Sequence, residues 1–206
     1  MKKKLIFLSF ECLFICLIFV LFCSCSNSRQ SISDYPTNST LSKGEIISDE
    51  KYYKIIKDEN FEFTYFLYDY KKKIVEKQTV KDNPLNIELL NDNVVDVSIG
   101  KGTGLSEHYY YSVDRDSFSK NYLYVIAYSN EKIAYIDVPN ENAFENRHLV
   151  VRNVFDKSLY YQEYNMDFSK VDTPVISAAF INNDTQLQIT YLSGEQQTEF
   201  TKMIDL

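Results

Sequence analysis

Hydrophobic and polar residues alternate in short segments along most of the chain after residue 50. Between residues 61 and 68 a large hydrophobic side chain occupies every second position, which is the period of a strand. No window longer than about ten residues keeps a helical period. The hydrophobic residues are mainly Val, Ile, Tyr and Phe, which favour strands. The predicted strands cover residues 52–56, 61–68, 74–80, 85–90, 94–99, 107–113, 122–128, 132–138, 149–155, 159–168, 175–181, 186–192 and 196–204.

Short polar turns separate these predicted strands. Two of them are Asn91-Asp92-Asn93 and Asn182-Asn183-Asp184. Short strands at regular spacing with polar turns between them are typical of antiparallel all-β domains. We therefore predict an all-β fold, with a single short helical turn after Pro139, capped by Asn140.

A weak internal repeat accompanies the strands. Asp69, Asp114 and Asp156 each follow the apolar end of a predicted strand and precede a turn that contains Lys or Arg, and they are 45 and 42 residues apart. A period of about 43 residues is the size of one four-stranded propeller blade, and the segment from Ala178 to Gly194 resembles the hairpins of such blades. Because Asp is also a favoured turn residue, a β-sandwich or a barrel remains the alternative to propeller-like units.

The N-terminal residues form a different pattern. Residues 1–4 contain three lysines and precede an apolar run from Leu5 to Cys23, which ends at Ser24-Cys25. A positive segment, an apolar segment and a small residue are the parts of a secretory signal peptide. The sequence Leu21-Phe22-Cys23-Ser24-Cys25 resembles the lipobox of bacterial lipoproteins. This resemblance implies that Cys25 is acylated and becomes the mature N-terminus, held by lipid such as palmitate on the extracytoplasmic face of the cell membrane.

An uncleaved membrane helix and a fully released protein are the alternatives to a lipid anchor. A membrane helix needs about 20 apolar residues, and the run from Leu5 to Cys23 supplies 19 with Glu11 inside it. An acidic residue in such a helix costs about 2–3 kcal/mol on insertion scales. We predict a lipoprotein signal peptide over residues 1–25, a flexible Ser/Asn/Thr-rich tether over 26–50 and one all-β domain over 51–206.

The charge of the mature chain argues against a nucleic-acid partner. Without residues 1–25 the chain keeps 19 basic and 28 acidic side chains, a net charge of −9. Binding to a nucleic-acid backbone requires clustered Lys and Arg, and the one basic run, Lys71-Lys72-Lys73, is expected to be a solvated turn. The expected partners are the membrane, through the lipid, and an envelope protein or extracellular ligand.

The distribution of cysteine and histidine limits the chemistry of the folded part. All four cysteines lie within residues 1–25, so the predicted domain has no thiol for a disulfide, a zinc site or a nucleophile. His108 and His148 are the only histidines, and no calcium-loop motif occurs. We therefore expect neither a metal nor another cofactor.

The candidate binding residues are Lys101, His108 and Tyr110, beside the glycine-rich loop from Gly100 to Gly104. A phosphate-binding loop would lead into a helix, but a predicted strand follows here. We interpret the segment as a flexible loop, and loops placed by a rigid sheet commonly carry binding residues.

A Ser-His-Asp set can be drawn on the same predicted strand. Ser106, His108 and Asp114 share one face of it, but neighbours on one face of a strand lie about 7 Å apart. That spacing is too long for a direct hydrogen bond from Ser to His, so we predict a solvated polar face opposite the buried Tyr109 and Tyr111.

Two functional classes fit the sequence. The favoured one is a ligand- or protein-binding or structural module without enzymatic activity. The alternative is a secreted hydrolase that uses paired carboxylates, since the 28 acidic residues of the mature chain allow such a pair.

Overall fold

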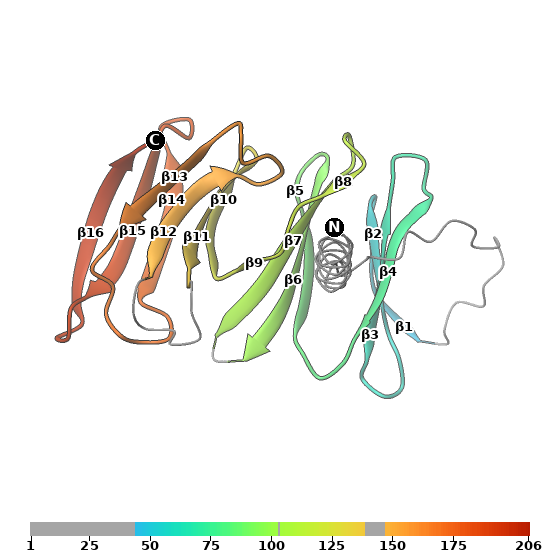
Figure 1. Cartoon of the computed structure of the whole chain (residues 1–206). Coiled ribbons are helices and arrows are strands. Elements are labelled where there is room, and N and C mark those ends of the chain that lie inside the picture. Colours follow the sequence, from blue (N-terminus) through green and yellow to red (C-terminus); the bar gives the residue numbers. More distant parts are fainter. Residues whose placement is uncertain (1–43, 103, 139–146) are drawn as a thin grey trace, which may run out of the picture. The chain divides into compact units, whose positions relative to one another are not determined.

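The computed structural model describes residues 44–102, 104–138 and 147–206. These residues form antiparallel strands arranged in four sheets (Figure 1), which confirms the predicted all-β fold. Cys25, the signal peptide, most of the tether and the helical turn expected after Pro139 lie outside the described residues.

Each sheet is built from strands that follow one another in the sequence. The first sheet contains β1 (Glu45–Asp49), β2 (Tyr53–Lys57), β3 (Phe63–Tyr68) and β4 (Ile74–Val80). The second contains β5 (Leu85–Asn91), β6 (Val94–Gly102), β7 (Leu105–Ser112) and β8 (Ser117–Phe118), with β9 (Tyr122–Leu123) also paired to β7. The third contains β10 (Val125–Ser129), β11 (Lys132–Asp137), β12 (His148–Asn153) and β13 (Tyr161–Asn165). The fourth contains β14 (Val175–Ile181), β15 (Gln186–Ser193) and β16 (Thr198–Asp205).

The sheets recur with nearly the period expected from the sequence. Their first strands begin at residues 45, 85, 125 and 175, so successive sheets start 40, 40 and 50 residues apart. The described strands close no barrel, because each sheet has two different edge strands. The predicted repeat therefore corresponds to one small meandering sheet per unit.

The three repeated aspartates occupy equivalent places in the first three sheets. Asp69 follows β3, Asp114 follows β7 and Asp156 follows β12, and each of these is the third strand of its sheet. The Oδ1 atom of Asp69 accepts backbone hydrogen bonds from Lys71 and Lys73 at 2.8 Å, and that of Asp156 accepts one from Ser158 at 2.8 Å. The repeat therefore marks the turn into the fourth strand, where a short acidic side chain can pair with free backbone N–H groups.

Three hydrophobic layers join consecutive sheets. The first–second layer includes Tyr65, Leu67, Val95, Val97, Tyr109 and Tyr111. The second–third layer includes Val94, Tyr110, Tyr122, Ile133, Tyr135 and Val150. The third–fourth layer includes Ala134, Ile136, Leu149, Val151, Leu187 and Ile189. Successive residues of β7 and of β11 alternate between two layers, so both faces of the second and third sheets are buried.

Two boundaries differ from the sequence prediction. Residues 45–49 were expected in the tether, but they form β1 and pair with β2, so the folded part begins before residue 51. The strand expected over 122–128 is divided at Tyr124, whose φ is +56°. At this residue the chain leaves the second sheet, where β9 pairs with β7, and enters the third.

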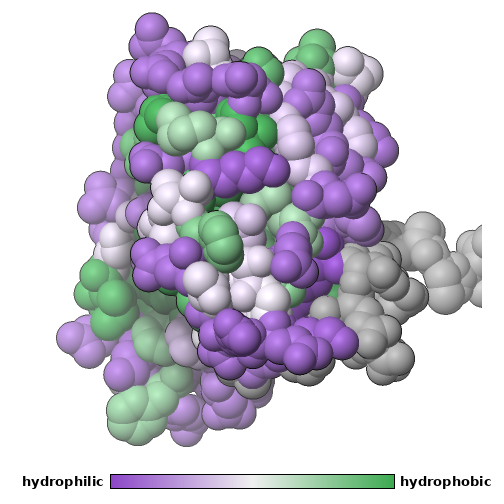
Figure 2. Space-filling view, turned by 90° about the vertical axis from the view of Figure 1, so that its left-hand side faces the viewer, coloured by the Kyte–Doolittle hydropathy of each residue, from purple (hydrophilic) through white to green (hydrophobic). Residues whose placement is uncertain are grey.

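The side of the molecule on which β16 lies in Figure 1 is exposed to solvent. Ile176, Phe200 and Met203 are about half exposed in the fourth sheet, at 53%, 50% and 47%. Figure 2 shows hydrophobic residues interspersed among hydrophilic ones on this side. A docking surface is normally a contiguous apolar patch, so these scattered residues do not mark one.

Candidate functional site

The face of β7 that carries His108 and Tyr110 is covered by the third sheet, which makes the predicted solvated polar face wrong. Tyr110 is completely buried, and its ring stacks on that of Tyr128 with centroids 5.3 Å apart. Tyr109 and Tyr111 are buried on the opposite face, as predicted. A sheet that lies between two others buries both faces, which alternation within one strand does not reveal. Tyr110 therefore belongs to the core between the second and third sheets and has no surface for direct ligand contact in this structure.

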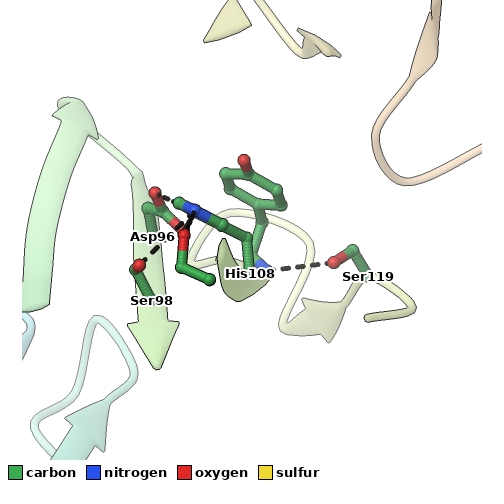
Figure 3. A network of polar contacts seen from close by, with 6 residues as sticks. Asp96, Ser98, His108 and Ser119 are labelled. Carbon is green, nitrogen blue, oxygen red and sulfur yellow. Dashed lines mark hydrogen bonds and ion pairs between the residues drawn. The ribbon is translucent and has the colours of Figure 1, made fainter. Parts of the chain in front are cut away.

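His108 is held between a carboxylate and a hydroxyl group (Figure 3). Its Nδ1 lies 3.0 Å from Oδ2 and 3.1 Å from Oδ1 of Asp96, and its Nε2 lies 2.7 Å from Oγ of Ser106. Oγ of Ser98 lies farther from Nε2, at 3.4 Å. Because a carboxylate only accepts, Nδ1–H donates to Asp96, and Nε2 is then the acceptor for the Ser106 hydroxyl.

The expected separation of Ser106 and His108 is thus wrong, and the carboxylate that contacts His108 is not Asp114, the one drawn from the sequence. A spacing of about 7 Å applies to backbone positions two residues apart, whereas these side chains lean together until Oγ and Nε2 are 2.7 Å apart. Asp114 is bonded to the Asn93 side chain instead. The acid, Asp96, comes from β6, and its position within the apolar run from Val94 to Val97 was the available sequence signal.

This arrangement contains the nucleophile, base and orienting acid of a serine hydrolase. Catalysis would also need a substrate cavity and donors for an oxyanion. Ser106 and His108 line neither of the two cavities considered below. The same contacts also satisfy Asp96, which is only 5% exposed and needs donors wherever it is buried.

Lys101 engages a carboxylate on the strand beside His108. Its Nζ lies 2.7 Å from Oε2 of Glu107, and Nδ2 of Asn121 donates to Oε1 of the same carboxylate at 3.0 Å. The hydrogen bond from Lys101 holds the pKa of Glu107 below its ordinary value of 4.5. Since Glu107 and His108 are successive residues of β7, Lys101 and His108 act on opposite faces of the strand.

A cavity of about 200 Å³ adjoins this ion pair, between β9 and β11. Asn121 belongs both to the cavity wall and to the hydrogen bond with Glu107, so the cavity lies next to the predicted loop region. Its lining consists of Lys120, Asn121, Tyr122, Leu123, Tyr135, Ile136, Asp137 and Val138.

Lys120 lies over the tyrosine rings of this cavity. Its ammonium is 5.0 Å from the ring centroid of Tyr122 and 5.4 Å from that of Tyr135. The guanidinium of Arg152 lies 5.6 Å from the Tyr122 ring. Although Lys120 as a whole is exposed, burial of its ammonium against the rings and the neighbouring charge of Arg152 lower its pKa below 10.5. The sequence did not reveal this cluster because its members come from three separate segments.

A second, wider cavity of about 650 Å³ lies at the turns between β5 and β6 and between β10 and β11. Its lining is entirely polar: Asn91, Asp92, Asn93, Asn130 and Glu131. Glu131 is paired with Arg115 at 2.7 Å, which leaves Asp92 as the carboxylate of the lining outside an ion pair. The lining therefore contains two carboxylates, Asp92 and Glu131, and one of them, Glu131, is ion-paired.

Within the described ranges, no group of three or more His, Cys, Asp or Glu side chains is arranged to hold a metal ion. No helix in the same part of the chain is long and apolar enough to cross a membrane.

Comparison with known proteins gives no family for this chain. No protein-family model matches it, and no curated protein matches its sequence significantly. The functional argument therefore depends on the residues themselves.

Proposed function

We propose that the chain is a lipid-anchored binding module on the extracytoplasmic face of the cell membrane. The lipobox-like segment ending at Cys25 supports the anchor, and the acidic mature chain supports a domain that stands away from anionic lipid. The observation that carries binding is the cavity between β9 and β11, where Lys120 faces solvent without an ion-pair partner among the described residues.

The anchor is tested by metabolic labelling with a fatty-acid analogue. The wild-type chain is expected to be labelled, and Cys25→Ser is expected to lose the label and to accumulate as precursor or be released. Cys23→Ser is the matched control, because it removes a neighbouring thiol and leaves the acylated position intact. Label retained in Cys25→Ser would exclude lipidation at this residue.

A serine hydrolase is the second candidate function, and the 2.7 Å contact between Ser106 and His108 is the observation that favours it. A fluorophosphonate probe, which reacts with activated serine hydroxyls, separates the two functions. A binding module is expected to leave Ser106 unlabelled, with identical results for wild type and Ser106→Ala. Labelling of the wild type that disappears in Ser106→Ala would assign the chain to the enzymes.

A further inference from the structure

The cavity between β9 and β11 has an unusual charge for this protein. Lys120 contributes to its wall, and Arg152 and Lys157 are close enough to act on the Lys120 ammonium electrostatically. Arg152 is 7% exposed and donates from Nε to the backbone oxygen of Asn153 at 2.9 Å. The Lys157 ammonium lies 3.8 Å from the ring centroid of Tyr161.

None of these three cations forms an ion pair with a described carboxylate. The mature chain carries 28 acidic side chains, so many carboxylates could have served as ion-pair partners for these cations. Tyrosine rings take their place, and a ring face attracts a cation without neutralising it. The Lys120 ammonium in the cavity wall is therefore available to an anionic group of a ligand.

The lining of the cavity also contains an acidic residue. Asp137 ends β11 as an exposed residue of the lining, and its charge reaches Lys120 without an ion pair between the two. The amide of Asn121 and the exposed Leu123 complete the accessible wall, whereas Tyr122 and Tyr135 are buried behind it. A ligand in this space therefore meets both a cation and a carboxylate acceptor.

This polarity selects among anions. A phosphate carries close to two negative charges and would be repelled by Asp137, and it has little to donate to that carboxylate. A monocarboxylate that also carries hydroxyl or ammonium groups matches both Lys120 and Asp137. The cavity of about 200 Å³ is smaller than the ~300–1,000 Å³ of drug-sized sites, so the ligand is no larger than one sugar or one amino acid.

We propose that the cavity between β9 and β11 binds a small carboxylate with hydroxyl or ammonium donors, its carboxylate at Lys120 and its donors at Asp137. Sugar acids and α-amino acids share this chemistry. The proposal rests on the binding function inferred above and names the ligand class of its cavity.

Isothermal titration of the full chain in detergent micelles tests the proposal. The probes are glucuronate, serine, glucose and inorganic phosphate. Glucuronate or serine is expected to bind at least tenfold more tightly than glucose and phosphate, and whichever binds identifies the source as sugar acid or amino acid. Equal or tighter binding of phosphate, or no binding of either carboxylate, would overturn the proposal.

Variants place the ligand in the cavity. Lys120→Gln is expected to weaken the carboxylate at least tenfold, and Asp137→Asn at least threefold. Lys77→Gln is the matched control, because its ammonium also lies 5.4 Å from an aromatic ring, that of Phe66, but outside the cavity. Unchanged affinity in Lys120→Gln would overturn the site. If no carboxylate binds but the fatty-acid label is still found at Cys25, only the ligand assignment fails. If a carboxylate binds but Cys25 is not labelled, only the anchor fails.

Discussion

The layer between the third and fourth sheets and the layer between the second and third differ in chemistry. The buried residues of the third–fourth layer are mainly aliphatic, from Ala134 on β11 to Ile204 on β16. The second–third layer is rich in tyrosine, and Asp96 and Arg152 are buried beside it at 5% and 7% exposure. Charged residues are seldom buried unless they are paired, so the second–third layer keeps polar groups that an ordinary core would not contain.

The positions of these polar groups explain the difference. Asp96 is satisfied by His108, and Arg152 by a backbone oxygen and the ring of Tyr122. The candidate cavity opens at the edge of the same layer, where β9 leaves the second sheet. The third–fourth layer stabilises the fold mainly by apolar burial, and its buried charged residue, Arg147, donates from Nη1 to the backbone oxygen of Val171. The second–third layer buries both a cation and a carboxylate, Arg152 and Asp96.

The largest expected effect follows from removing the partner of the buried carboxylate. His108→Ala deprives Asp96 of its donor, and an uncompensated buried charge costs about 3–5 kcal/mol of unfolding free energy. Urea denaturation of the full chain measures the loss.

The double variant Asp96→Leu/His108→Leu is the control for this prediction. Replacing both partners of a buried polar contact by apolar side chains of similar shape often leaves stability unchanged. We expect the double variant to recover most of the stability lost in His108→Ala. A cost below about 1 kcal/mol for His108→Ala, within the range of exposed pairs, would show that Asp96 finds other partners or water.

The aliphatic part of the third–fourth layer should respond mainly to changes in side-chain volume. Leu187 is completely buried in it, and Leu187→Ala is expected to cost about 2–5 kcal/mol through lost burial and the cavity left behind. Leu187→Met nearly conserves volume and should cost less than about 1.5 kcal/mol. The same denaturation experiment measures both, and equal losses in the two variants would contradict a layer that depends on packing alone.

Much of the fold was predictable because strand formation is local. The alternation of residues gave β4 and β14 their observed bounds, and the repeated aspartates marked equivalent turns. β1 was missed because residues 45–49 pair along an exposed edge, with four of the five exposed, and have little apolar pattern of their own.

The candidate site was less predictable because it depends on contacts between segments. His108 was identified from the sequence, but its partner Asp96 depends on the register of β6 against β7. Lys120 reaches Tyr135, fifteen residues later in the chain, because β9 packs beside β11, and the sequence does not reveal that packing. Local sequence patterns predict strands and turns. The layers between sheets bring together residues that are far apart in the sequence, and no residue spacing predicts those contacts.

A smaller effect distinguishes Lys120 from an ordinary surface lysine. Burial lowers its pKa below 10.5 in the folded state, so the unfolded state binds the proton more tightly. The wild type should therefore gain stability relative to Lys120→Gln as the pH rises through the lowered pKa toward 10.5. Urea midpoints measured across this alkaline range check the sign. Lys77→Gln, which removes a ring-facing ammonium elsewhere in the fold, is the control, and a falling difference for Lys120 would contradict burial as the cause.

The smallest expected effect is at the exposed ion pair of Lys101 and Glu107. Both side chains are partly exposed, at 45% and 29%, and such pairs contribute about 0–1 kcal/mol. The pKa of Glu107 is lowered below 4.5, so this contribution is present above pH 4.5 and is lost as the pH falls through the lowered pKa. Lys101→Gln should therefore differ slightly from wild type near neutral pH and converge with it in acid, as urea midpoints at both pH values will show. If Lys101→Gln instead lowered the unfolding free energy as much as His108→Ala does, burial would not explain the difference between the two pairs. The contrast between the exposed Lys101–Glu107 pair and the buried second–third layer would then fail.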